Sequence, residues 1–153
     1  MRIRPATPDD VDSMRELAGA STSAAHWTRG QYQELFSSDA PSQRLALVAE
    51  GEPSSVISVF GFLIAHHLAP DWELENIAVA PSAQRKGIAK RLLKALFAAA
   101  GETNSETVFL EVRESNTPAR RLYESAGFQQ QGRRKSYYSN PIEDAILYRH
   151  DLR

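Results

Sequence analysis

Two periods of apolar residues alternate along the chain and predict where strands and helices lie. Apolar residues at every second position, or in a short unbroken run, are typical of strands. Such patterns occur at residues 2–6, 44–50, 56–66, 72–79, 107–113, 128–138 and 144–152. Apolar residues three and four positions apart are typical of helices. They occur after Thr7, after Thr28, over 84–100 and over 118–126. This order predicts an α/β (α+β) fold with one mixed sheet flanked by helices.

Residues that favour helix ends support these boundaries. Thr7 is suited to cap the first helix, Asn116 or Thr117 the last, and Gly127 to end it. The helix expected over 84–100 has the most regular apolar stripe: Ile88, Leu92, Leu93, Leu96 and Phe97. Polar and turn-forming residues predict loops at 37–43, 51–55 and 101–106.

The composition is that of a globular protein and excludes several classes. With 153 residues, of which 42 % are hydrophobic and 24 % charged, the chain has the size and make-up of one domain, residues 1–153. The absence of cysteine excludes disulfides and cysteine nucleophiles. The longest apolar run, 59–65, is far shorter than the ~18 residues of a membrane helix. Because no apolar signal core follows Met1 either, we expect a cytoplasmic protein without a membrane partner.

Charge is distributed unevenly along the chain. Residues 1–83 carry 5 Lys or Arg and 11 Asp or Glu, whereas residues 84–153 carry 13 and 8. A basic half can hold a phosphorylated ligand, although solvated helix faces give the same statistic. We expect no direct nucleic-acid binding, because no nucleic-acid motif accompanies the charge.

The histidines do not suggest a metal site. His66 and His67 are adjacent in a predicted strand and therefore point to opposite faces. His26 and His150 have no residues at ligand spacing around them. We therefore expect no metal.

The segment 76–89 carries the clearest chemical signal. It places a strand ending at Val79, a short loop, and the sequence QRKGIA (84–89) at the start of a long helix. Unpaired N–H groups at a helix N-terminus attract phosphate, and Gly87 allows a phosphate to approach the backbone. Because the dinucleotide and P-loop motifs are both absent, the segment predicts a different pyrophosphate site.

QRKGIA resembles the pyrophosphate loop of the GCN5-related N-acetyltransferases (GNAT). A second stretch is similar to another signature of that family: Leu110–Arg113, Asn116, Ala119, Leu122–Glu124, Gly127 and Phe128. Within the family, RRKSYY (133–138) with 143–145, and His26–Trp27–Thr28, resemble the RimI-type ribosomal-protein-alanine N-acetyltransferases, although the proline usual before Trp27 is absent. The resemblance implies a mostly antiparallel sheet and acetyl-CoA as cofactor. It implies these cofactor-binding residues: Ile77, Ala78, Val79, Gln84, Arg85, Lys86, Gly87, Ile88, Ala89 and Asn116.

The resemblance also implies two catalytic residues. Glu111 corresponds to the general base, and apolar neighbours on its strand would raise its pKa; alternatively it is a structural partner of Arg113 or another cation. Tyr123 corresponds to the general acid, and it also fits a buried apolar stripe. Asn116 suits both a contact with the pantetheine arm and a helix cap.

Residues at two further positions are candidates for binding the acceptor. Glu73 shares a strand with Glu75 and is a second candidate base or an ammonium ligand; a bulge between the two would change which face they share. Tyr137 and Tyr138 resemble paired tyrosines near the family branch's peptide groove, and cross-strand packing accounts for them equally well.

The implied activity is transfer of an acetyl group to a protein N-terminus, with alanine of a small-subunit ribosomal protein as the expected acceptor. Two alternatives remain open at this point. One keeps the fold but acetylates a small-molecule amine or a lysine side chain, and the other is a non-catalytic regulator that binds acyl-CoA. The oligomeric state is not readable from the sequence.

Overall fold

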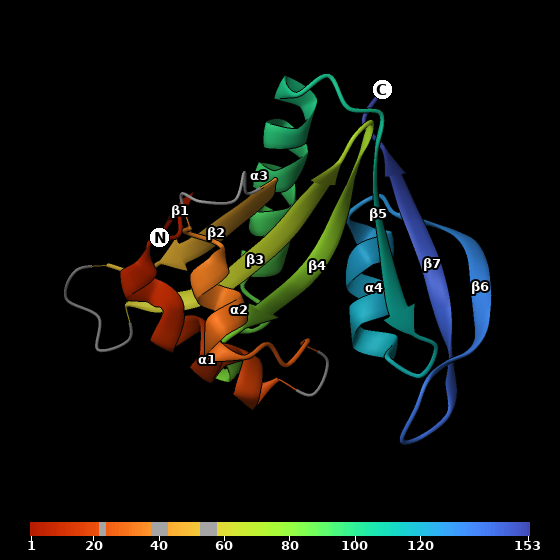
Figure 1. Ribbon diagram of the computed structural model, residues 1–153, viewed down its shortest axis with the longest axis horizontal. Helices are drawn as coiled ribbons and strands as arrows, with labels where there is room; N and C mark the ends of the chain where they lie inside the picture. Colours follow the sequence, from red (N-terminus) through yellow and green to blue (C-terminus); the bar gives the residue numbers. More distant parts are fainter. Residues whose placement is uncertain (22–23, 38–42, 53–57) are drawn as a thin grey trace.

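A seven-stranded sheet forms the centre of the computed structural model, which describes residues 1–21, 24–37, 43–52 and 58–153 (Figure 1). The strand order is β1-β2-β3-β4-β5-β7-β6. The strands are β1 (Arg2–Pro5), β2 (Arg44–Glu50), β3 (Val59–Leu68), β4 (Asp71–Val79), β5 (Thr107–Arg113), β6 (Gln129–Tyr138) and β7 (Glu143–Asp151). All neighbouring strands are antiparallel except β4 and β5, which run parallel. The predicted fold class and element order are therefore confirmed.

Four helices cover the sheet: α1 (Val11–Ala20), α2 (Arg29–Glu34), α3 (Ile88–Glu102) and α4 (Thr117–Ser125). Figure 1 shows α1 and α2 on one face and α3 on the other. Phe97 of α3 and Tyr123 of α4 both contact the ring of Phe128, so α3 and α4 share a face. Helices thus cover both faces at the centre of the sheet, whereas the edge strand β6 is mostly exposed.

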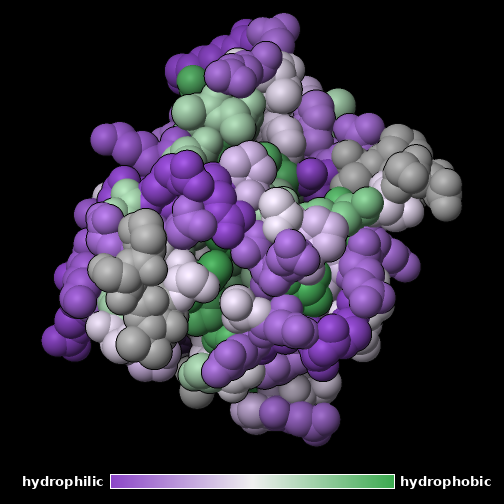
Figure 2. All heavy atoms as spheres, turned by 90° about the vertical axis from the view of Figure 1, so that its left-hand side faces the viewer, coloured by the Kyte–Doolittle hydropathy of each residue, from purple (hydrophilic) through white to green (hydrophobic). Residues whose placement is uncertain are grey.

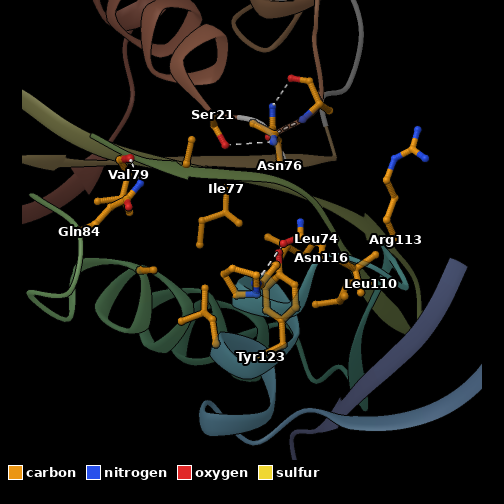
Figure 3. Close-up of a pocket in the computed structure, with 18 of the residues that line it drawn as sticks. Ser21, Leu74, Asn76, Ile77, Val79, Gln84, Leu110, Arg113, Asn116 and Tyr123 are labelled. Atoms are coloured by element: carbon orange, nitrogen blue, oxygen red, sulfur yellow. Dashed lines mark hydrogen bonds between the residues drawn. The ribbon is translucent and has the colours of Figure 1, made fainter. Parts of the chain in front are cut away.

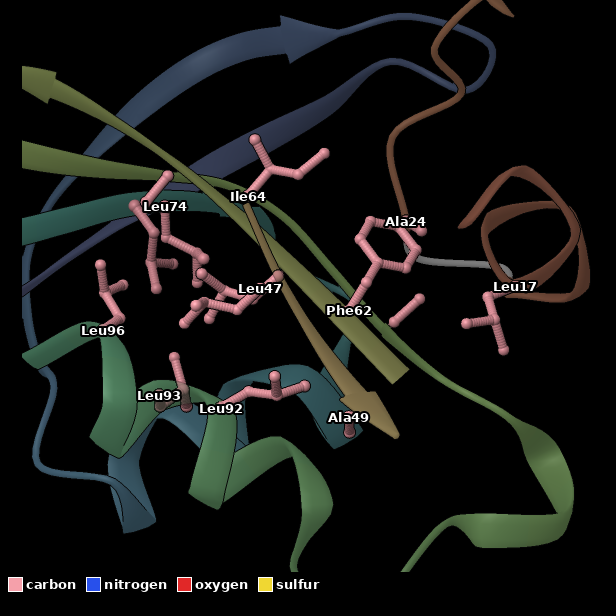
Figure 4. Packing of buried hydrophobic residues seen from close by; sticks show 14 of the residues in the cluster. Leu17, Ala24, Leu47, Ala49, Phe62, Ile64, Leu74, Leu92, Leu93 and Leu96 are labelled. Atoms are coloured by element: carbon pink, nitrogen blue, oxygen red, sulfur yellow. The ribbon is translucent and has the colours of Figure 1, made fainter. Parts of the chain in front are cut away.

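The unbroken apolar run of β3 follows from this double cover. Phe62 packs against the ring of Tyr32 on α2, with 6.4 Å between centroids. On the opposite face, a Cβ at Gly61 would lie 3.3 Å from Ile88 and 3.1 Å from the Ala78 carbonyl. Leu92, Leu93 and Leu96 of α3 add fully buried side chains below β2 and β3 (Figure 4). A strand covered on both faces needs apolar residues at consecutive positions rather than alternating ones.

Several predicted boundaries are wrong, each for a local reason. The helix expected over 84–100 begins only at Ile88, because Arg85 and Gly87 have left-handed backbone angles (φ 66° and 76°) that no helix accommodates. It then continues to Glu102, into the predicted loop 101–106. The first helix opens with a 3₁₀ turn over Pro8–Asp10. The expected loops at 37–43 and 51–55 lie largely outside the described residues, as does the start of the strand expected at 56.

The surface viewed from the α1 side is mainly hydrophilic. Figure 2 shows hydrophobic side chains there only in small areas between polar ones. No helix in the described part of the chain has the length and apolar character needed to cross a membrane. His67 stacks on Trp72 and His150 on Phe97, and the described residues contain no group of three potential metal ligands.

The hydroxyl of Tyr32 is buried without a hydrogen-bond partner among the described residues. Burial also raises the pKa of this phenol, so the hydroxyl stays protonated and its hydrogen bond is not made. We expect Tyr32→Phe to increase the free energy of unfolding by about 1 kcal/mol, because the unmet group is removed while the ring is kept. Urea unfolding measures the change.

Tyr148→Phe is the matched control, since the Tyr148 hydroxyl accepts a 3.0 Å hydrogen bond from Arg120. There we expect a loss of about 1 kcal/mol. Equal losses in both variants would show that the Tyr32 hydroxyl is bonded in solution.

Candidate active site

β4 and β5 separate along their length and leave a cleft between them. The two strands pair only at Trp72 with Val108 and at Glu73 with Phe109. Beyond this point a cleft of about 1300 Å³ opens. Its walls come from residues 74–79, 83–85, 87–90 and 110–113, from α4, and from residues 24–26 before α2. In Figure 3, Ile77, Leu110 and Tyr123 point into the same space.

The backbone of β4 forms one wall of this cleft. Ile64 pairs with Asn76 but Ala65 pairs with Leu74, so Glu75 is an extra, bulged residue in β4. Ile77, Ala78 and Val79 line the cleft, and β4 has no strand partner on the β5 side beyond Glu73. Buried backbone groups require a partner, and an extended ligand with amide groups, such as pantetheine, can supply one.

The N-terminus of α3 forms one end of the cleft. Gly87 is its N-cap and provides no side-chain acceptor, so the first N–H groups of the helix are left for a ligand. Gln84, Arg85, Gly87, Ile88 and Ala89 line the cleft. Fifteen residues of aligned peptide dipoles make this end attractive to an anion.

Two of the predicted loop residues, Lys86 and Gln84, occupy different positions in the turn. Lys86 does not line the cleft as its neighbours do, so its expected contact with the cofactor is not supported by its position. Gln84 lines the cleft, and its Nε2 also donates to the carbonyl of Val79, the last residue of β4, at 3.4 Å. This bond fixes the turn between β4 and α3.

Substituting Gly87 should weaken anion binding through the backbone rather than through a clash. A Cβ at Gly87 would meet nothing within 4 Å, but the φ of 76° lies in the left-handed region. We expect Gly87→Ala to lower stability by about 1 kcal/mol and to weaken acetyl-CoA binding, measured by thermal unfolding and titration calorimetry. Gly101→Ala in the middle of the last turn of α3 is the control, and there the helix should gain slightly. An unchanged acetyl-CoA affinity in Gly87→Ala would contradict this role of the turn.

Glu111 lies on the cleft side of β5 but is not in a purely apolar setting. Val108, Leu110 and Val112 are buried, as the alternation predicted, and Glu111 lines the cleft. Its carboxylate forms an ion pair with Arg134 of β6 at 3.0 Å. The expected apolar surroundings are therefore wrong: a cation from β6, which lies beyond β7 in the sheet, partly neutralises the carboxylate. Arg113 is not that cation, since it pairs with Glu143.

Tyr123 reaches the cleft from α4 on the opposite side from β4. It is 8 % exposed, its ring packs on Phe128 and Tyr148, and it lines the cleft. Burial raises the pKa of its phenol, which keeps the hydroxyl protonated and able to donate. The two readings of this residue, apolar packing and a functional hydroxyl, are compatible in this geometry.

Asn116 caps α4, as one of the two sequence-based interpretations predicted. Its Oδ1 accepts a 3.2 Å hydrogen bond from the Ala119 N–H. Asn116 also lines the cleft, so its amide nitrogen remains available as a donor there. A contact with the pantetheine arm stays a prediction.

Carboxylates gather where the cleft opens beside the bulge. Burial, together with the charges of Glu75 and Glu111, raises the pKa of Glu73. Glu75 is bound by Arg44 at 2.7 Å, whereas no ion pair is recorded for Glu73 within the described ranges. Glu73 itself is not among the residues that line the cleft, and its role in binding an acceptor remains a prediction.

The paired tyrosines of β6 occupy different positions. Tyr138 lines the cleft and packs under the guanidinium of Arg113, 4.4 Å from its ring centroid. Tyr137 is 52 % exposed, and the charge of Glu111 raises the pKa of its phenol. The sequence did not distinguish them, and the structure brings Tyr138 into the cleft wall and leaves Tyr137 at its rim.

Sequence reasoning missed three features of the site. The sequence assigned no role to Arg134, which pairs with Glu111, to Asn76, or to Ala25, which Asn76 binds. An ion pair between distant strands leaves no local pattern, because register across the sheet decides it. The one available signal was that Asn76 is the polar residue on a face of β4 that otherwise carries the apolar residues Trp72, Leu74 and Ala78.

Comparisons with known proteins agree with this geometry. The model of the Acetyltransferase (GNAT) family matches residues 11–128. The ribosomal protein bS18-alanine N-acetyltransferase of Haemophilus ducreyi is 43 % identical over 93 residues, which span 59 % of this chain and 64 % of that protein. A Bacillus subtilis protein named as a putative enzyme of the same kind is 26 % identical over 95 % of this chain and 91 % of its own length.

A solved structure extends the likeness over nearly all of the chain. The crystal structure of the ribosomal-protein-S18-alanine N-acetyltransferase from Escherichia coli superimposes with a TM-score of 0.83 at 26 % identity. The match covers 99 % of this chain and 93 % of that one. With a family model that covers most of the chain, a cleft between diverging parallel strands and an open helix N-terminus at its end, the chain belongs to the GNAT acetyltransferase family.

Proposed function

We propose that the protein transfers an acetyl group from acetyl-CoA to the α-amino group of a protein N-terminus, with alanine of a small-subunit ribosomal protein as the acceptor. The observation that carries this proposal is that one cleft joins three elements. These are the open N-terminus of α3, the unpaired edge of β4, and the Glu111–Tyr123 pair. The similarity to enzymes named for ribosomal protein bS18 supports the acceptor.

The residues of the cleft fit acetyl-CoA. The first N–H groups of α3 and Arg85 suit the pyrophosphate, and the edge of β4 suits the amides of pantetheine. When bound, acetyl-CoA supplies the acetyl group as a thioester. A β4 N–H near the bulge would polarise the thioester carbonyl as an oxyanion hole does.

Glu111 and Tyr123 would then move the two protons that the reaction requires. Glu111 takes a proton from the acceptor ammonium, directly or through a water molecule, and frees the nitrogen lone pair. The C–N bond forms as the C–S bond breaks, and the Tyr123 hydroxyl donates its proton to the departing sulfur. The second proton that the nitrogen loses on becoming an amide returns to the Tyr123 phenolate, directly or through water. Before it acts as a base, Glu111 exchanges Arg134 for the acceptor ammonium at its carboxylate.

Intact mass spectrometry tests this proposal. The purified protein is mixed with acetyl-CoA and peptides that differ only at the first residue, with N-blocked lysine peptides and small amines as controls. We expect one added acetyl group on the free α-amine, strongest for alanine-first peptides. Modification of small amines or lysine alone would show that the protein acetylates a different acceptor. Binding of acetyl-CoA without transfer to any acceptor would identify a regulator.

A further inference from the structure

Residues 24–26, which lie between α1 and α2, form part of the wall of the cleft. Ala24, Ala25 and His26 line the cleft, and Ala24 is buried in the core. Along β4 they lie beside Asn76, three residues before Val79, where the strand turns toward the pyrophosphate end. Under the proposed function, the pyrophosphate binds at the N-terminus of α3 beyond Val79, and the acceptor would enter the part of the cleft beside Asn76 that this wall lines.

One side chain of β4 holds this wall. The Oδ1 of Asn76 accepts from the Ala25 N–H at 3.2 Å, and its Nδ2 donates to the Ala25 carbonyl at 3.2 Å (Figure 3). The amide thus pairs with both backbone groups of one residue, as a neighbouring strand would. Asn76 is 4 % exposed and is one of very few buried polar side chains among the described residues.

A second contact fixes the far side of the same segment. Arg44 binds Glu75 at 2.7 Å, and its guanidinium lies over the ring of Trp27, 5.8 Å from the centroid. Trp27 in turn packs on Tyr32, with 5.5 Å between ring centroids. The two anchor residues, Glu75 and Asn76, are consecutive in β4 and lie at the bulge.

We propose that Asn76 is a positioning residue that sets acceptor affinity by fixing residues 24–26 against the cleft, without touching the acetyl donor. The inference rests on the proposed function. A buried amide is unfavourable unless both its donor and its acceptor form hydrogen bonds. Here both form hydrogen bonds with Ala25. An apolar residue of similar volume would fill the same buried space, so packing alone does not explain an amide at this position.

Asn76→Asp is the sharpest variant, because it keeps an acceptor for the Ala25 N–H but removes the donor for the Ala25 carbonyl. Asn76→Leu keeps the volume and removes both bonds. We expect the acceptor KM to rise by about tenfold in each, while the KM for acetyl-CoA is unchanged. Hydrogen exchange of residues 24–28 should accelerate in both variants, because each removes the bond to the Ala25 carbonyl, and it should accelerate more in Asn76→Leu, where the Ala25 N–H also loses its partner.

Thr107→Val is the matched control. It deletes a buried hydrogen bond, from Thr107 Oγ1 to Asp71 at 2.5 Å, at the closed end of β5 outside the cleft. It should lower stability while leaving both KM values unchanged. The inference is overturned if the Asn76 variants leave the acceptor KM unchanged, raise both KM values equally, or behave like Thr107→Val.

The wild-type protein separates this test from that of the proposed function. If it acetylates only small amines, the proposed acceptor is wrong, and the same KM comparison with such an amine decides the role of Asn76. If it acetylates peptides and the Asn76 variants keep the wild-type acceptor KM, the proposed function stands and the inference falls.

Discussion

Glu111→Gln is expected to lower kcat by about 10²- to 10⁴-fold, because a general base contributes that much to an acyl transfer. Glutamine keeps the shape of the side chain but cannot accept the proton of the acceptor ammonium. Steady-state kinetics with an N-terminal peptide measure the change. Acetyl-CoA binding should be retained, since the residues expected to hold it lie on β4, in the turn before α3, on α3 and at Asn116, and none lies on β5.

Two further variants separate catalysis from structure. Arg134→Met removes the ion pair with Glu111 but keeps the carboxylate, and we expect it to preserve kcat within a few-fold. Glu114→Gln breaks the neighbouring ion pair with Arg133, outside the cleft, and should leave the kinetics unchanged. A loss in Arg134→Met as large as that in Glu111→Gln would show that Glu111 serves only as its partner.

Tyr123→Phe is expected to lower kcat by about 10²-fold or more, because the departing sulfur loses its proton donor. The ring packs among Phe128 and Tyr148 in either variant, so the fold should be kept. Circular dichroism and thermal unfolding check this point. Tyr148→Phe, which removes a buried hydroxyl outside the cleft, should retain kcat.

The pH dependence follows from the same environment. Burial disfavours the phenolate, and so the pKa of Tyr123 lies above its ordinary value near 10. Tyr123 is therefore protonated throughout the neutral range, and its titration should produce no fall in kcat below about pH 10. If an alkaline fall below that pH were present in the wild type and absent in Tyr123→Phe, this assignment would be wrong.

The fold was predictable because apolar residues repeat with different periods in its strands and its helices. The alternation of β5 marked it from Thr107 to Arg113, and the stripe of α3 marked the helix that covers β3. The start of α3 was not predictable, because the polar and basic residues Gln84, Arg85 and Lys86 are compatible with a helix. Left-handed angles at Arg85 and Gly87 instead form a turn, and only the glycine is a sequence signal for such angles.

The candidate site was predictable where single segments form it and less so where strands meet. The loop at 84–89 and the cap at Asn116 are local, and their residues lie in the cleft apart from Lys86. The partner of Glu111 is Arg134, contributed by a strand one position removed in the sheet. Sequence patterns carry no register between β5, β7 and β6, and so they could not name it.

The pairing of β4 with β5 at only two positions has a thermodynamic consequence. A sheet interrupted in its middle has fewer cohesive contacts there than a continuous one, and a ligand that bonds to the free edge replaces the absent strand. By mass action, such a ligand at a hundred times its Kd stabilises the folded state by about 2.7 kcal/mol. Saturating acetyl-CoA should therefore raise Tm, and the two halves of the sheet should unfold more cooperatively with it than without it.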